Sequence, residues 1–101
     1  MDIRYENRSV VREWEQLFPK FSSQLSQLYD QLASDSRYWP KSDKHYQLKG
    51  ELATKTKGGK PLERWQHKIS GAGRIWFLVD EDARTVWLEA AGEGHPSKTD
   101  K

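Results

Sequence analysis

Hydrophobic residues recur first at helical spacing and later at strand spacing along this chain. Residues 2–5 alternate polar and apolar side chains and predict a short first strand. From Ser9, a residue type that caps helices, apolar side chains follow at intervals of three and four until Pro19 interrupts them. The same spacing resumes at Phe21 and continues to Leu32. We therefore predict two helices that pack as a helical hairpin.

Three stretches in the second half of the chain alternate with the period of a β-strand. They cover residues 63–70, 73–80 and 84–91, and short turns separate them. Consecutive strands with short turns form an antiparallel sheet. A strand, two helices and then three strands predict an α+β domain in which the helical hairpin covers one face of a mainly antiparallel, twisted sheet. Residues 45–63, with a Gly58-Gly59 turn, form a long basic connection that we expect to be partly mobile.

The two faces of the predicted sheet differ in polarity. The more apolar face should pack on Trp14, Leu25, Leu28 and Leu32 of the helices, and it carries Trp65, Ile69, Ile75, Phe77 and Val79. The opposite face carries Arg64, Lys68 and Arg74, with Trp76 between them. Basic side chains with an interleaved aromatic ring suit an RNA backbone and stacked bases. Polar residues on the solvent face of a half-covered sheet are also ordinary, and both interpretations stay open.

Composition favours one soluble domain of residues 1–101. Aromatic residues make up 12% of the chain, which argues against disorder. The absence of cysteine excludes disulfides and thiolate metal sites. The longest apolar run, residues 75–79, is far too short to span a membrane, and we expect a cytoplasmic protein.

Positive charge is concentrated in the middle of the chain. The net charge is +2, yet residues 41–68 hold eight Lys or Arg against three Asp or Glu, a local net charge of +5. A basic segment in a nearly neutral chain is typical of a protein that binds a polyanion. A solvated lysine-rich loop is the alternative, and composition does not decide between the two.

Histidine is the side chain whose unperturbed pKa allows proton transfer near neutrality. His45 falls in the basic connection, and His67 falls between apolar strand positions, where a half-buried structural role is typical. The spacing of the three histidines predicts no metal site. His95 lies in the closing segment GHPSKTDK, of which residues 95–101 form a C-terminal tail. Neither a nucleophile-elbow motif nor a phosphate-binding glycine loop is present.

The order of four short motifs resembles the RelE/ParE superfamily of bacterial toxins. These motifs are Leu48-Lys49-Gly50, the W-x-x-x-I strand that starts at Trp65, the R-I-W-F-L-V strand that starts at Arg74, and the closing Gly94-His95-Pro96-Ser97-Lys98-Thr99. Each motif alone is weak, whereas their order along the whole chain is specific. The closing motif is similar to that of one branch of RelE-like toxins.

The resemblance implies the toxin of a type II toxin–antitoxin system. RelE-type members enter the ribosome and cleave mRNA through attack of a ribose 2′-OH on the adjacent phosphate, without a metal or a cofactor. A cognate antitoxin is the implied partner, in a toxin–antitoxin hetero-oligomer. Arg74 matches the arginine that contacts the scissile phosphate, Lys49 and Lys68 match basic catalytic positions, and His95 matches a group that transfers protons. The expected RNA contacts are Lys98, Arg64, Lys44, Lys55, Lys57 and Trp76.

The chain also departs from the RelE pattern. Some relatives use a catalytic carboxylate, and Tyr46 stands at the matching position here, with Glu51 and Glu63 as possible substitutes. Two further functions stay open for this reason. One is a ParE-type inhibitor of DNA gyrase without RNase activity, and the other is a relative that binds RNA without cleaving it.

Overall fold

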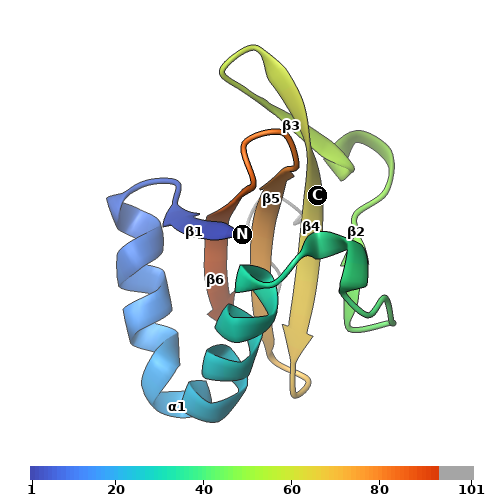
Figure 1. Ribbon diagram of the computed structural model, residues 1–101. Coiled ribbons are helices and arrows are strands. Elements are labelled where there is room, and N and C mark those ends of the chain that lie inside the picture. Colours follow the sequence, from blue (N-terminus) through green and yellow to red (C-terminus); the bar gives the residue numbers. More distant parts are fainter. Residues whose placement is uncertain (94–101) are drawn as a thin grey trace.

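One bent helix packs against a mixed β-sheet in the computed structural model, which describes residues 1–93 (Figure 1). The elements are β1 (Asp2–Tyr5), α1 (Arg8–Ala33), β2 (His45–Gln47), β3 (Thr54–Lys57), β4 (Lys60–Ile69), β5 (Gly73–Asp80) and β6 (Thr85–Glu93), with 3₁₀ helices at Ser36–Tyr38 and Gly50–Leu52. The strand order is β1-β6-β5-β4-β2, and β3 also pairs with β4. β1 runs parallel to β6, while the other paired strands are antiparallel.

The predicted α+β class and the mainly antiparallel sheet are confirmed. The strand β5 has the bounds that the alternation predicted, but the part of the chain described has six strands where four were expected. The two additional strands, β2 and β3, come from the connection that was expected to be partly mobile. β3 has the sequence TKTK, which offers no apolar alternation, and its pairing with β4 orders it instead.

The predicted pair of helices is one long helix with a bend. Phe21 has non-helical dihedral angles (φ −135°, ψ 39°), two residues after Pro19. Proline lacks an N–H donor and its ring clashes with the preceding turn, so a kink at this point is expected. On either side of the bend the two halves of α1 run in opposite directions (Figure 1). The N-cap is Asn7, whose side chain accepts from the Val10 N–H at 3.2 Å, and not Ser9 as predicted.

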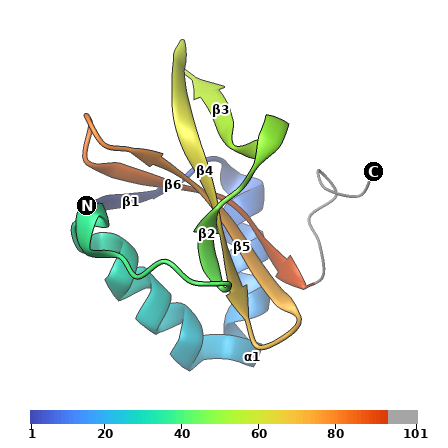
Figure 2. The same cartoon turned by 90° about the vertical axis from the view of Figure 1, so that its right-hand side faces the viewer.

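The core lies between α1 and one face of the sheet, as the apolar pattern predicted (Figure 2). All nine residues expected there belong to the same buried cluster: Trp14, Leu25, Leu28, Leu32, Trp65, Ile69, Ile75, Phe77 and Val79. Trp39 joins them, with its ring centroid 5.8 Å from that of Trp65 and 5.8 Å from that of Phe77 in edge-to-face contacts. No helix within residues 1–93 combines the length and the apolar character that a membrane span requires.

A β-bulge in β6 changes which residues face away from the helix. Trp76 pairs with Ala90, but its neighbour Phe77 pairs with Leu88, so Glu89 is an extra residue on β6. A bulge of this kind turns a side chain out of the regular alternation. It directs the Glu89 carboxylate to the face of the sheet that α1 leaves uncovered, where it meets Arg64.

Candidate nucleic-acid interface

Two cations lie directly opposite each other on the helix-free face of the sheet. In the β4–β5 register Lys68 pairs with Arg74, and we call these two residues the basic pair. In the part of the chain that the structure describes, neither side chain has a carboxylate within the 4.0 Å of a salt bridge. Like charges at opposed strand positions repel each other. The basic pair is therefore a place where a bound anion would relieve repulsion.

The guanidinium of Arg74 is positioned by backbone carbonyls of the β4–β5 turn. Its Nη1 donates to the carbonyl oxygen of Gly73 at 3.0 Å and to that of Gly71 at 3.3 Å. Its Nε is buried and has no hydrogen-bond partner among residues 1–93. The side chain is thus held by the turn without being neutralised, which keeps its charge available for an anion.

A short chain of hydrogen bonds crosses the same face beside the basic pair. The indole N–H of Trp76 donates to Oε1 of Gln66 at 2.8 Å, and Nε2 of Gln66 donates to the Tyr46 hydroxyl at 2.7 Å. Because the Tyr46 oxygen accepts this bond, its own hydrogen is left to donate to another group. The Lys68 Nζ lies 5.5 Å from the centre of the Tyr46 ring. The sequence reasoning placed residue 46 in a loop and did not include Gln66 in the site.

Arg64 and Trp76, two of the predicted RNA contacts, are both buried, which does not favour this role; it stays a prediction. Arg64 is 7% exposed, and its Nε and Nη2 donate to the two oxygens of Glu89, each at 3.0 Å. Trp76 is fully buried, with the Arg64 guanidinium 5.2 Å from its ring centre. The β6 bulge supplies the carboxylate that neutralises Arg64. Both residues therefore form the support under the site and not its surface.

Lys55 and Lys57 are ordered in β3 and engaged with acidic or aromatic side chains. Lys55 Nζ lies 2.9 Å from a carboxylate oxygen of Glu6 and 3.0 Å from one of Glu89. Lys57 Nζ lies 4.3 Å from the centre of the Trp87 ring. The local excess of positive charge that the sequence showed is thus largely compensated on this hairpin. Their predicted role as RNA contacts stays a prediction that these interactions do not favour.

The remaining predicted lysines, Lys44 and Lys49, lie on either side of β2 in the chain. Lys44 is exposed and adjoins the basic pair, because the Lys68 N–H donates to its carbonyl oxygen at 2.8 Å. Lys49 is also exposed, but the next pairing along the chain joins Leu48 to Arg64. Five residues of extended chain separate Lys44 from Lys49, about 17 Å at strand spacing. The structure therefore brings Lys44, and not Lys49, next to Lys68 of the basic pair.

A pair of histidines, His45 buried and His67 half-buried, joins β2 to β4 on the helix side of the sheet. Nδ1 of His45 lies 3.0 Å from Nδ1 of His67, and Nε2 of His45 lies 3.2 Å from Nε2 of Gln31 on α1. Burial, together with the neighbouring His67, lowers the pKa of His45 to about 4, and burial also lowers the pKa of His67. Both rings are neutral at physiological pH. The predicted half-buried structural role of His67 fits this arrangement, whereas the pairing with His45 had no signal in the sequence.

The predicted functional residues of the tail, His95 and Lys98, lie outside the described residues. Within residues 1–93, no group of three or more histidine, aspartate or glutamate side chains could hold a metal ion. The described part of the site thus consists of cations, amides and a phenol, which are groups that bind an anion and donate hydrogen bonds to it.

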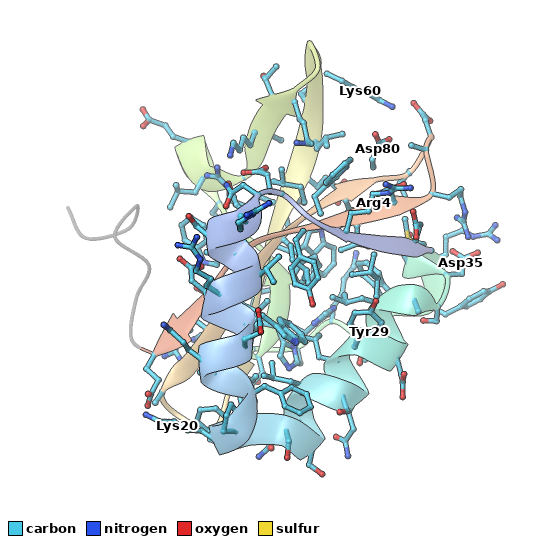
Figure 3. The ribbon with its side chains drawn as sticks, turned by 90° about the vertical axis from the view of Figure 1, so that its left-hand side faces the viewer. Arg4, Lys20, Tyr29, Asp35, Lys60 and Asp80 are labelled. Atoms are coloured by element: carbon cyan, nitrogen blue, oxygen red, sulfur yellow. The ribbon has the colours of Figure 1, made fainter. Side chains whose placement is uncertain are left out.

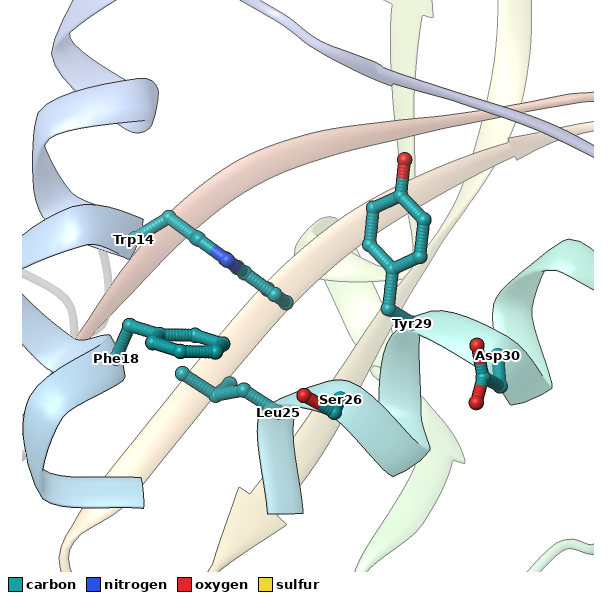
Figure 4. Close-up of a pocket in the computed structure, with 6 residues that line it drawn as sticks. All are labelled: Trp14, Phe18, Leu25, Ser26, Tyr29 and Asp30. Carbon is teal, nitrogen blue, oxygen red and sulfur yellow. The ribbon is translucent and has the colours of Figure 1, made fainter. Parts of the chain in front are cut away.

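A small apolar hollow lies inside the bend of α1. Trp14, Phe18, Leu25 and Tyr29 line it together with Ser26 and Asp30 (Figure 4). Its volume of about 160 Å³ is smaller than typical ligand pockets, which start at about 300 Å³. Because its lining holds a carboxylate and no cation, it has no part in anion binding.

No protein-family model matches this chain, and no curated protein or solved structure matches it either. The resemblance to RelE-like toxins thus rests on the order of motifs along the chain.

Proposed function

We propose that this protein is a RelE-like toxin, an endoribonuclease that cuts mRNA on the ribosome. The observation that carries the proposal is the basic pair, Lys68 and Arg74, which lacks a carboxylate partner within residues 1–93 and in which Lys68 lies over the Tyr46 ring. A phosphate of single-stranded RNA is an anion of the size and charge that such a pair attracts. The bent α1 followed by antiparallel strands supports a RelE-like fold, in which the two halves of α1 correspond to the helical hairpin.

Cleavage by this route needs no metal ion. The ribose 2′-oxygen attacks the adjacent phosphorus, the bond to the 5′-oxygen breaks, and the products are a 2′,3′-cyclic phosphate and a free 5′-hydroxyl. A base takes the proton of the 2′-OH, and an acid returns one to the 5′-oxygen. Extra negative charge develops on the phosphate oxygens during attack, and positioned cations stabilise it.

The residues divide these roles by their chemistry. Arg74 and Lys68 contact the non-bridging phosphate oxygens, and the Tyr46 hydroxyl donates a hydrogen bond at the same place. His95 supplies the proton transfer, because the pKa of an unperturbed histidine lies near neutrality. Lys98 binds a neighbouring phosphate.

The proposal is tested by primer extension on an mRNA that purified ribosomes translate, with and without the protein. We expect a new cut inside the A-site codon. Arg74→Ala should reduce the cleavage rate by about 100-fold or more, the effect of removing one donor from a transition-state site. His95→Ala should abolish the cut if this residue transfers the proton. Circular dichroism of each variant shows whether it is folded.

Two results would contradict the proposed ribonuclease activity and indicate another function. A protein that stops growth when induced but makes no cut would be a ParE-type gyrase inhibitor. A protein that binds RNA but neither cuts it nor stops growth would be a non-catalytic RNA-binding relative.

The partner in this proposal is a cognate antitoxin that covers the helix-free face around Arg74. Its contacting segment should be acidic, because that segment meets the uncompensated charges of the basic pair. Co-expression of the antitoxin should restore growth, and a complex that leaves the Arg74 face open and the ribosome accessible would contradict this arrangement.

A further inference from the structure

A polar groove lies between the second half of α1 and the end of β4. Its volume is about 340 Å³, within the range of ligand sites. The polar residues that line it are Gln24, Gln27 and Gln31 of α1, and Lys44, His67, Lys68 and Ser70 on the sheet side. Leu28 and Ile69 add apolar surface, and no acidic residue takes part in the lining.

The three glutamines form a stripe of neutral hydrogen-bonding groups along α1. Their spacing of three and four residues places them on one side of a helix. Each amide offers both donors and an acceptor, the combination that reads the edge of a nucleobase or a ribose hydroxyl. Lys44 and Lys68 line the side opposite this stripe, and neither has a carboxylate within salt-bridge distance in residues 1–93. A ligand with a neutral hydrogen-bonding part and an anionic part matches this lining.

The groove continues the site that carries the proposed function. Lys68 borders both: its side chain lies with Arg74 on the helix-free face, and the residue also lines the groove at the end of β4. Lys44 is joined to it through the Lys68 N–H bond. An RNA strand whose phosphate lies on the basic pair can therefore reach the groove with its next nucleotide.

We infer that the groove is a binding site for one nucleotide of single-stranded RNA, next to the phosphate held by Lys68 and Arg74. In this site Lys44 contacts a phosphate and Gln27 contacts the base or the ribose. The inference rests on the proposed function for the identity of the ligand, and it adds residues of α1 to a site that otherwise lies on the sheet.

The test is fluorescence anisotropy of a short, labelled single-stranded RNA titrated with the whole protein over a series of salt concentrations. Lys44→Ala should weaken binding and reduce the slope of log affinity against log salt by about 0.7, the value for one lost phosphate contact to a single strand. Gln27→Ala should weaken binding by about fivefold and leave the salt slope unchanged, because an amide carries no charge.

Matched controls separate the groove from general electrostatics. Lys41 and Gln16 are exposed and lie outside the groove, so Lys41→Ala and Gln16→Ala should keep the affinity and the salt slope of the wild type. Circular dichroism confirms that each variant is folded; all four substituted side chains are exposed, which limits their effect on folding.

The outcomes distinguish this inference from the proposed function. If Arg74→Ala weakens RNA binding while Lys44→Ala and Gln27→Ala do not, the groove is not a nucleotide site, and the proposed function stands. Equal effects of Lys44→Ala and Lys41→Ala on RNA affinity and salt slope also overturn the inference. They would show that RNA is attracted by the overall positive charge and not bound in the groove. A wild-type protein that neither binds this RNA nor cuts mRNA on the ribosome overturns both.

Discussion

Lys68 and Arg74 occupy opposed positions on neighbouring strands, where two positive charges destabilise the folded state. Opposed like charges change stability by about 0.2–1 kcal/mol. We therefore expect Lys68→Gln to leave the free energy of unfolding unchanged or to raise it within this range, while RNA affinity falls. Urea denaturation and RNA titration of the same preparation measure the two effects. A clear loss of stability would mean that Lys68 has a structural role and would remove the main support for an anion site.

Glu89 provides the opposite case on the same face of the sheet. Its side chain is fully buried and accepts from Arg64 and Lys55. Removing one partner of a buried ion pair leaves an uncompensated charge, which costs about 3–5 kcal/mol. We expect Glu89→Gln to lower the free energy of unfolding by about 3 kcal/mol in urea denaturation. Glu93→Gln, at an exposed carboxylate that pairs with Lys20, is the control and should change stability by less than about 1 kcal/mol.

The lowered pKa values of His45 and His67 make the stability of the protein depend on pH. The pKa of His45 is about 4 in the folded protein, against 6.5 for the unperturbed side chain. Between these two values the unfolded chain binds a proton that the folded chain does not, so stability falls as pH falls from about 6.5 towards 4. The full loss from His45 amounts to about 3 kcal/mol. His67 acts in the same direction, because its pKa is also lowered.

Thermal or urea denaturation between neutral pH and pH about 4 measures this dependence. His45→Gln should flatten it, whatever its effect on stability at neutral pH, because it removes the group with the lowered pKa. An equally steep dependence in that variant would assign the effect to carboxylates. Asp35 and Asp80 also have lowered pKa values, but their stabilisation is lost below their ordinary pKa of 3.8, at more acidic pH.

Single-residue predictions from the sequence succeeded where strand alternation decides the face of a residue. Lys68 and Arg74 share the helix-free face as predicted. Arg64 shares it too, yet it is buried, because a bulge brings Glu89 onto it. Alternation cannot show a bulge, since the bulge is itself a departure from the period of two. Tyr46 was noted only as a departure from the RelE pattern, and its strand was not predicted, because three residues are too few to show alternation.

At the scale of elements, the turn between β3 and β4 orders part of the basic connection. Its turn residues Gly58 and Gly59 have φ of +61° and +79°, the left-handed region that disfavours side chains. We expect Gly59→Ala to destabilise the protein by about 1 kcal/mol in urea denaturation. Gly71→Ala is the matched control, because Gly71 is in open space and lacks a left-handed φ, and it should be nearly neutral. Equal effects would show that the hairpin turn does not determine the pairing of β3.

The elements that the sequence predicted well are those with long periodic patterns. β5 and the apolar stripe of α1 carry enough residues for the period to be read. The bend of α1 was indicated by Pro19, but proline alone does not tell whether a helix ends or bends. Here the backbone leaves helical geometry only at Phe21, and both halves bury apolar residues on the same sheet. β2 and β3 depend on pairing with β4, a non-local interaction that local pattern cannot reveal.

At the scale of the whole molecule, the basic middle of the chain divides into two groups once it is folded. Lys55, Lys57 and Lys60 of the hairpin lie near acidic partners, as Lys60 and Asp80 do at 2.9 Å (Figure 3). Lys44 and Lys68 have no such partner among the described residues and lie beside each other at the end of β4. Net charge along the sequence does not separate these groups, since the compensating acids come from distant segments.

This division predicts that two double variants with the same change in net charge behave differently. Lys44→Gln with Lys68→Gln should lower RNA affinity and reduce the salt slope by about 1.4, two phosphate contacts at 0.7 each, with little change in stability. Lys55→Gln with Lys57→Gln should lower the free energy of unfolding, because Glu6 and Glu89 lose cationic partners, and should keep the salt slope of the wild type. Anisotropy titrations and urea denaturation of both variants provide the comparison. Equal salt slopes would mean that RNA is attracted by net charge alone, whereas unequal slopes in this order place the RNA at the end of β4.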